Sequence, residues 1–338
     1  MNKTLLLIFS LVFPILIVEA QEIFDFEAKI DNRDRFIFKE VTYTNEKDNI
    51  KLSGTLILPK GEYKSIVTIV PGSGKDTRHS HFVLAESLLE NNIGVFRFDE
   101  RGVGKSEGVN SSGVLKLSSD LSAGISYLRK LEGLANKKFG VIGHSLGGLA
   151  AVDAYEKQKQ IDFMVLWAAP VKKHSAFIKH QIESDNPFFG AITAETKQQK
   201  LEIVEIIHQQ IIENKDLNAW DIYKKCKKIL KDELDVKKSQ FQVYIMPYVV
   251  EIVRADYEQT YASSNIPILY IIGSEDKFVS PKNSSDLIKE FNNPMVEFRM
   301  YKGLNHYMTN GELEGIAREV YHLDQQVKNE MIDWIKNR

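Results

Sequence analysis

A serine between two glycines is the feature of this sequence with the clearest chemical potential. Residues 143–147 read Gly-His-Ser-Leu-Gly, with Ser145 at the centre. A serine hydroxyl is a weak nucleophile at neutral pH, so it needs exposure, a base within hydrogen-bonding reach and a nearby site for a developing oxyanion. Glycines on either side permit a sharp strand-to-helix turn against closely packed neighbouring chains. The pattern therefore predicts Ser145 as a catalytic nucleophile.

The segments on both sides of this turn fit the same interpretation. Residues 139–142 form a short apolar run typical of a buried strand, and residues 149–152 read Leu-Ala-Ala-Val, which favours a helix. An incidental glycine-rich turn is the alternative interpretation, and it does not account for a strand directly before the motif and a helix directly after it.

Two residues further along the chain are candidates for the partners of Ser145. Asp276 follows the apolar run 267–272, and His306 follows the run 296–301, which gives the order serine, acid, histidine. His306 would take the serine proton and return it to the leaving group, while Asp276 would fix the imidazole tautomer and stabilise the imidazolium. Glu275 is the rival candidate for the acid.

The oxyanion site requires two backbone N–H groups. Leu146, the residue after the nucleophile, is predicted to supply the first. The second is expected from the loop that follows the first buried strand, residues 71–74, which read Pro-Gly-Ser-Gly. We predict Ser73 for this role, with Gly74 as the alternative.

This chemistry requires no cofactor or metal, and none is predicted. His79 and His81 resemble a metal-binding pair, but no third ligand is evident, so a structural role is favoured. His144 is expected to point away from the nucleophile and pack beneath the turn. Residues 102–106 and 72–75 mimic a phosphate-binding loop, yet neither has the glycine that such a loop needs five positions before its Gly-Lys pair.

Apolar runs and helical patterns alternate along the chain that carries these residues. The runs 36–44 and 50–58, joined by a polar turn, predict a hairpin. Further strands are expected at 66–70, 94–98, 139–142, 163–167, 267–272 and 296–301, with helices near 82–90, 117–131, 145–158 and 327–335. Strands separated by helices imply parallel pairing. The sequence therefore predicts an α/β fold with a mostly parallel central sheet flanked by helices.

One long interval interrupts this alternation. Between residues 171 and 262 there is helical periodicity without a convincing buried strand, as in Ile203, Val204, Ile207 and Ile211. We predict an inserted helical cap over 171–262, between the two parts of one core at 21–170 and 263–338.

The overall composition is that of a folded protein with ample core material, because 43% of its 338 residues are hydrophobic and 27% are charged. Its 44 basic and 46 acidic residues give a formal charge of −2, so no global field attracts nucleic acid or an anionic membrane. A small-molecule partner is expected. The only cysteine, Cys226, excludes an intramolecular disulfide.

The N-terminus has the features of a signal peptide. Lys3 precedes an apolar stretch over 4–18, and small residues at Val18 and Ala20 offer a cleavage site after residue 20. A membrane anchor is the alternative, but the run is shorter than the ~20 residues that a spanning helix needs, and Pro14 interrupts it. The sequence therefore predicts an exported protein, periplasmic or secreted, without a stable membrane span after cleavage.

Taken together, residues 36–170 and 265–337 resemble the α/β-hydrolase esterases grouped with the serine aminopeptidase and dienelactone hydrolase-like families. The resemblance rests on five segments: Leu-Ser-Gly-Thr-Leu at 52–56, Pro-Gly-Ser-Gly at 71–74, Phe-Asp-Glu-Arg-Gly-Val-Gly-Lys-Ser at 98–106, the motif at 143–147, and Leu-Asn-His at 304–306. It implies that Asp99 and Arg101 brace the active-site turn. The sequence departs from these relatives at Leu146, where they often have glutamate, and after Gly74, where they usually have proline.

The resemblance and the predicted site together favour a carboxylesterase that acts on small-molecule esters through an acyl-enzyme on Ser145. A serine peptidase or aminopeptidase acting on short peptides or aminoacyl amides is the alternative. A non-catalytic ligand-binding protein on the same fold is a further one, although only chemistry requires a serine, an acid, a histidine and an oxyanion site together.

Overall fold

The computed structural model describes residues 23–30, 33–110, 113–186, 196–311 and 321–338. The predicted signal peptide, residues 1–20, lies outside these ranges. Within them, no helix is both long enough and apolar enough to cross a membrane.

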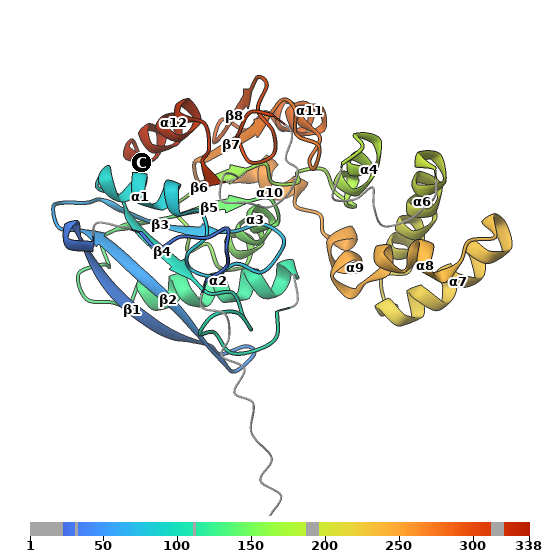
Figure 1. Ribbon diagram of the computed structural model, residues 1–338, viewed down its shortest axis with the longest axis horizontal. Helices are drawn as coiled ribbons and strands as arrows, with labels where there is room; N and C mark the ends of the chain where they lie inside the picture. Colours follow the sequence, from blue (N-terminus) through green and yellow to red (C-terminus); the bar gives the residue numbers. More distant parts are fainter. Residues whose placement is uncertain (1–22, 31–32, 111–112, 187–195, 312–320) are drawn as a thin grey trace, which may run out of the picture.

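A single sheet of eight strands forms the centre of the molecule (Figure 1). Its spatial order is β1-β2-β4-β3-β5-β6-β7-β8, with β1 and β2 forming an antiparallel hairpin, β2 antiparallel to β4, and all other pairs parallel. The predicted mostly parallel sheet is thereby confirmed. The strands are β1 (Phe36–Asn45), β2 (Ile50–Pro59), β3 (Ser65–Val70), β4 (Gly94–Phe98), β5 (Lys138–His144), β6 (Phe163–Trp167), β7 (Ile268–Gly273) and β8 (Val296–Tyr301).

Helices cover both faces of this sheet, and the central strands are apolar for that reason. Every residue of β3, β4, β6 and β7 is buried, as expected for strands that are packed on two sides. α1 packs against α12 and contacts β2 and β4, whereas α2 packs against α3, which lies along β5. These helices, with α11 beside β8, are α1 (Phe82–Glu90), α2 (Val114–Leu128), α3 (Leu146–Gln158), α11 (Pro281–Phe291) and α12 (Gln325–Lys336).

The region between β6 and β7 is helical and has an apolar core of its own. Buried side chains of α6 and α7, among them Ile207 and the lone Cys226, pack together apart from the main core. Figure 1 shows α6, α7 and α8 to one side of the sheet. The extent of the predicted cap, 171–262, stays a prediction. The described helices are α4 (Ala176–Glu183), α6 (Lys197–Glu213), α7 (Ala219–Leu234), α8 (Lys238–Phe241), α9 (Pro247–Arg254) and α10 (Glu258–Ser263).

A short N-terminal segment, residues 23–30, is fixed against the loop that precedes α1. The Glu27 side chain is fully buried and accepts hydrogen bonds from the Thr77 amide at 2.7 Å and the Thr77 hydroxyl at 2.6 Å. It also accepts a bond from the amide of Phe24, and the Ala28 amide donates to the His79 carbonyl. These bonds determine which cavities the segment lines.

Candidate active site

Ser145 occupies a strained turn between the last residue of β5 and the first residue of α3. Its backbone angles are φ 54° and ψ −121°, a conformation that non-glycine residues rarely adopt and that clusters at functional sites. The positions on either side need glycine because neighbouring backbone atoms approach them closely. A Cβ atom at Gly147 would lie 2.3 Å from two carbonyl oxygens, those of Val70 and Pro71, and one at Gly143 would lie 2.6 Å from the Gly147 carbonyl.

Asp276 and His306 meet at the carboxyl edge of the sheet, after β7 and β8 respectively. Asp276 Oδ2 lies 2.8 Å from His306 Nδ1, and both side chains are buried. The other carboxylate oxygen accepts hydrogen bonds from the amides of Phe278 and Val279, which fix the carboxylate. With an ionised Asp276 the shared proton resides on Nδ1, and Nε2 of His306 is then a proton acceptor.

Glu275, the rival acid, lies in a different environment. Its side chain is exposed and accepts a hydrogen bond from the Ser274 hydroxyl at 3.0 Å. The geometry therefore favours Asp276 as the partner of His306.

Ser145 and His306 both line one cavity of about 320 Å³, together with Ser73 and Gly74. Among the described residues no hydrogen bond joins Ser145 to His306; such contacts are often long without substrate and shorten in the reacting complex. The 71–74 loop runs directly alongside the serine, because a Cβ atom at Gly72 would lie 3.1 Å from the Ser145 Cβ.

Leu146 lies apart from the main cavity but next to the same loop. It is the first residue of α3, where backbone N–H groups have no acceptor within the helix. Leu146 and Ser73 line a second, smaller cavity together. The structure thus places both expected oxyanion donors beside Ser145, and their role stays a prediction.

His144 forms a neutral histidine pair with His81 on the floor of the cavity. His144 Nδ1 lies 3.2 Å from His81 Nε2, and the His144 ring stacks on Trp167 at 4.4 Å. Burial lowers the pKa of His81 to about 3, helped by the positive charge of Arg97. Burial, with smaller effects from His306 and His81, also holds the pKa of His144 well below its ordinary value. The packing expected of His144 is present, but the residue also lines the cavity.

Aromatic side chains that sequence reasoning did not single out form much of the cavity wall. Phe24 and Phe26 come from the N-terminal segment and stack with ring centroids 5.3 Å apart. Phe278 stacks on the His306 ring at 4.5 Å, and Tyr307 and Tyr321 complete the aromatic wall. The only signal for Phe24 and Phe26 was their alternation within a polar stretch.

A buried carboxyl group, Asp76, also lines this cavity. It accepts a hydrogen bond from the Tyr321 hydroxyl at 3.0 Å. Burial raises the pKa of Asp76 to about 7, with a smaller contribution from the nearby carboxylate of Glu27. Burial therefore favours the neutral form of this carboxyl far more than in an exposed aspartate.

The loop that contains Asp99 and Arg101 is held by buried ion pairs. Arg78 donates to Asp99 from Nε at 3.1 Å and from a terminal nitrogen at 2.7 Å. Arg101 forms a two-pronged contact of 2.8 and 2.7 Å with Asp120. These bonds fix the loop itself, and the expected bracing of the active-site turn by Asp99 and Arg101 stays a prediction. Among the described residues no cluster of three or more histidine, cysteine or acidic side chains could hold a metal ion.

Comparison with known protein families decides the membership of this chain. Residues 61–314, most of the sequence, match the family described as serine aminopeptidase, S33. The chain belongs to this S33 family of hydrolases. The expected resemblance to α/β-hydrolases is thereby confirmed.

Solved structures share the fold of this S33 family chain at low sequence identity. An esterase of Pyrococcus furiosus, Pf2001, superposes with a TM-score of 0.59 and 21% identity over 92% of this chain and 94% of its own. Est1E of Butyrivibrio proteoclasticus, with ferulic acid bound, gives 0.54 and 18% over 87% and 97%. A bromoperoxidase of Bacillus anthracis gives 0.53 and 16% over 88% and 100%. Together they establish the α/β-hydrolase fold.

Curated relatives of this S33 family chain match a smaller part of it. The uncharacterized protein YfhR of Escherichia coli (strain K12) is 30% identical over 158 residues, which is 45% of this chain and 54% of YfhR. YfhR of Salmonella typhi is 32% identical over 123 residues, or 34% and 40%. The chain therefore spans about half the length of the curated relatives that it matches.

Proposed function

We propose that this protein is an exported serine hydrolase that cleaves carboxylic esters through an acyl-enzyme on Ser145. The observation that carries the proposal is one cavity into which both the strained Ser145 and the Asp276-bound His306 open. Membership of a hydrolase family supports it.

The proposed reaction begins when His306 Nε2 accepts the Ser145 proton as the serine oxygen attacks the ester carbonyl. The backbone N–H groups of Leu146 and Ser73 stabilise the oxyanion, a contribution worth ~10²- to 10³-fold in turnover for each donor. The imidazolium then gives its proton to the leaving alcohol. Water, activated by His306, attacks the acyl-enzyme and releases the acid. Asp276 holds the imidazole in the required tautomer throughout.

The aromatic wall narrows the range of acyl groups that we expect the cavity to accept. Phe24, Phe26, Phe278 and Tyr307 present apolar faces around a cavity of about 320 Å³, a size and character typical of small-molecule sites. Esters with a short aliphatic or a single-ring acyl group fit such a space better than long lipid chains.

A peptidase acting on aminoacyl amides is the second candidate, and one observation favours it. Asp76 lines the cavity and, when ionised, could pair with the free amino group of such a substrate. Its pKa of about 7, raised first by burial, leaves much of it uncharged at neutral pH, so we place esters first.

Covalent labelling with a fluorophosphonate tests the proposed function. The wild-type protein is expected to be labelled and to hydrolyse p-nitrophenyl acetate and butyrate, and Ser145→Ala is expected to lose both. Ser126→Ala, which removes a hydroxyl group on α2 away from the cavity, is the matched control and should behave as wild type. Full esterase activity in Ser145→Ala would refute the mechanism. Higher kcat/KM on aminoacyl p-nitroanilides than on esters would establish the second candidate instead.

A further inference from the structure

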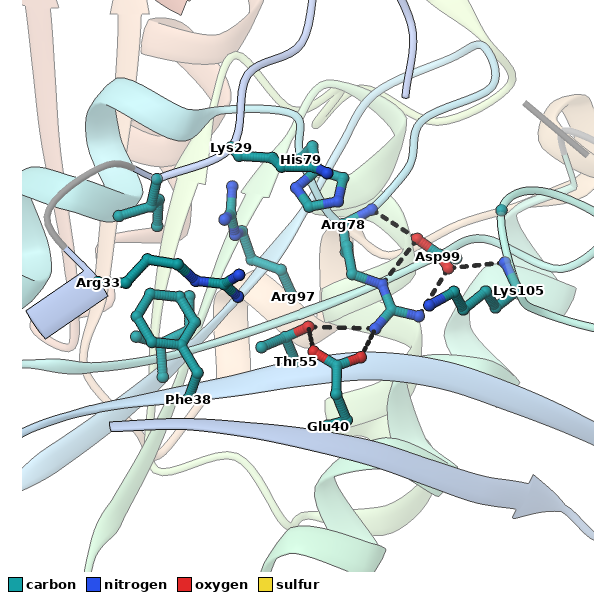
Figure 2. A pocket seen from close by; sticks show the side chains of 13 residues that line it. Lys29, Arg33, Phe38, Glu40, Thr55, Arg78, His79, Arg97, Asp99 and Lys105 are labelled. Carbon is teal, nitrogen blue, oxygen red and sulfur yellow. Dashed lines mark hydrogen bonds and ion pairs between the residues drawn. The ribbon is translucent and has the colours of Figure 1, made fainter. Parts of the chain in front are cut away.

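A second cavity, of about 190 Å³, lies over β1, β2 and β4 beside the N-terminal segment, and its wall is strongly basic (Figure 2). We call it the basic cavity. Its ionisable lining residues are Lys29, Arg33, Arg78, Arg97, Lys105, His79, Glu40 and Asp99.

The two acidic residues of the basic cavity both form ion pairs with Arg78. Asp99 accepts from two nitrogens of this guanidinium, and Glu40 accepts from a third at 2.7 Å. Figure 2 shows this network on one side of the cavity and the guanidinium groups of Arg33 and Arg97 on the other. Five cationic side chains against two anionic ones give the lining a net charge of +3, and its four cations other than Arg78 form no ion pair with either carboxylate.

Arg97 is the most unusual of these groups. Its side chain is only 5% exposed, yet it makes one hydrogen bond, from a terminal nitrogen to the Ser80 carbonyl at 3.1 Å, and its Nε is buried without a partner. Burial lowers its pKa to about 10, although the carboxylate of Glu27 opposes the shift. A buried charge without a paired counter-charge costs several kcal/mol. Such an unsatisfied buried group requires a specific explanation, and a bound anion is one that supplies the missing partner.

The groups around Arg97 are also available to a ligand. In the described part of the chain, Lys29 and Arg33 are exposed and form no ion pair, and Arg33 lies over the Phe38 ring at 4.5 Å, which holds its planar head in place. His79 Nδ1 is buried without a hydrogen-bond partner. Three cationic groups and one imidazole nitrogen thus surround the same space.

We propose that the basic cavity binds a phosphate group, either as free inorganic phosphate or as the head of a small phosphomonoester. Guanidinium groups match the oxygens of a phosphate in two-pronged contacts, and such charge-assisted bonds are about twice as strong as neutral ones. Arg97 and Arg33 supply the two forks, Lys29 supplies a point charge, and His79 supplies a further polar contact. On the other side of the cavity Arg78 is already paired with Asp99 and Glu40, so it does not take part in the proposed site.

This site is distinct from the proposed catalytic one, although the N-terminal segment contributes residues to both. We call the cavity of Ser145 and His306 the catalytic cavity, after its proposed role. Phe24 and Phe26 line it, whereas Lys29, further along the same segment, lines the basic cavity. Likewise, His81 lines the catalytic cavity and His79 lines the basic cavity. The proposed anion site therefore uses a later part of this segment than the cavity of Ser145 does, and the proposal does not depend on the proposed function.

Calorimetric titration of the intact protein tests the binding. Inorganic phosphate and glycerol phosphate are titrated separately at an ionic strength held constant with sodium chloride. Wild type is expected to bind phosphate saturably. Lys29→Gln/Arg33→Gln, which removes two exposed cations, is expected to bind at least about tenfold more weakly, because it loses two charge-assisted contacts to the anion. Lys130→Gln/Lys228→Gln makes the same charge change at exposed positions outside the cavity and should bind as wild type.

Thermal unfolding of Arg97→Met supplies an independent readout. If Arg97 serves a ligand, removal of its unpaired charge leaves the ligand-free melting temperature unchanged or raises it, and phosphate no longer raises it further. A lowered melting temperature together with undiminished phosphate binding would show a purely structural arginine and overturn the proposal. Absence of phosphate binding by wild type, or equal binding by Lys29→Gln/Arg33→Gln, would overturn it as well. Binding of inorganic phosphate alone would assign the free anion as the ligand. Binding of glycerol phosphate as well would assign the head of a phosphomonoester.

Discussion

The catalytic cavity and the basic cavity share the 23–30 segment but treat charge in opposite ways. In the catalytic cavity burial favours the neutral forms of His81, His144 and Asp76, and behind its wall Asp276 has three hydrogen-bond donors. In the basic cavity Arg97 is buried with a single bond.

The difference teaches that burial alone does not identify a site. A polar group whose hydrogen bonds are all made within the protein is held in position. A polar group that lacks such partners is available to a ligand. Asp276 is of the first kind, since its carboxylate can only act on His306. Arg97 is of the second kind, because nothing in the described chain uses its Nε.

Replacement of Asp276 by asparagine is expected to have the largest effect. The amide cannot hold His306 in the tautomer that leaves Nε2 as an acceptor, so kcat should fall by ~10⁴-fold. Glu275→Gln changes the neighbouring carboxylate, which is exposed and bonded to Ser274, and should leave kcat near that of wild type. Steady-state kinetics on p-nitrophenyl butyrate measures both. A larger loss in Glu275→Gln than in Asp276→Asn would reverse the assignment of the acid.

The site residues that could be predicted are those whose positions follow from local pattern. Ser145 was predicted from the glycines around it, and Asp276 and His306 from their places just after apolar runs, because the carboxyl ends of parallel strands meet at one edge. Backbone pairing positions these residues, and backbone pairing leaves a periodic signal in the sequence.

The residues that could not be predicted owe their environment to contacts between distant segments. Phe24 reaches the catalytic cavity because Glu27 bonds to Thr77, fifty residues away, and no local pattern encodes that contact. Arg97 lies within the apolar run 94–98, which correctly indicated a buried strand but not a buried cation without a partner. The basic cavity is therefore visible only in three dimensions.

Glu27→Ala is expected to affect both cavities at once. It leaves the buried Thr77 amide and hydroxyl without their acceptor, and each such loss costs ~1–3 kcal/mol. Because the same segment carries Phe26 and Lys29, we expect a higher KM for esters and weaker phosphate binding in one variant. Chemical denaturation, kinetics and calorimetry measure the three effects.

The control for this change is Asp25→Ala, which alters an exposed side chain of the same segment. It should move all three quantities much less than Glu27→Ala. A loss of stability in Glu27→Ala with unchanged behaviour of both cavities would show that the segment keeps its place without this anchor.

Asp76→Asn is expected to have the smallest effect, and the effect depends on pH. Burial raises the pKa of Asp76 from 3.8 to about 7, so between these values the folded state binds more protons than the unfolded state. Stability contributed by this group is then present below about pH 4 and is lost as the pH rises through about 7. The full shift corresponds to at most about 4 kcal/mol. An asparagine retains an oxygen acceptor for the Tyr321 hydroxyl but has no proton to lose.

Urea unfolding at pH 5 and pH 8 measures this contribution. Wild type should lose stability between the two pH values, and Asp76→Asn should lose less, while Asp333→Asn, an exposed change of the same kind, should follow wild type. Some pH dependence is expected to persist, because burial and the charge of Asp76 also raise the pKa of Glu100. Identical pH dependence in wild type and Asp76→Asn would mean that Asp76 is fully ionised in the folded protein. The catalytic cavity would then contain a carboxylate, in contrast to the cations of the basic cavity. A substrate with a free amino group would then fit the catalytic cavity better than a neutral ester.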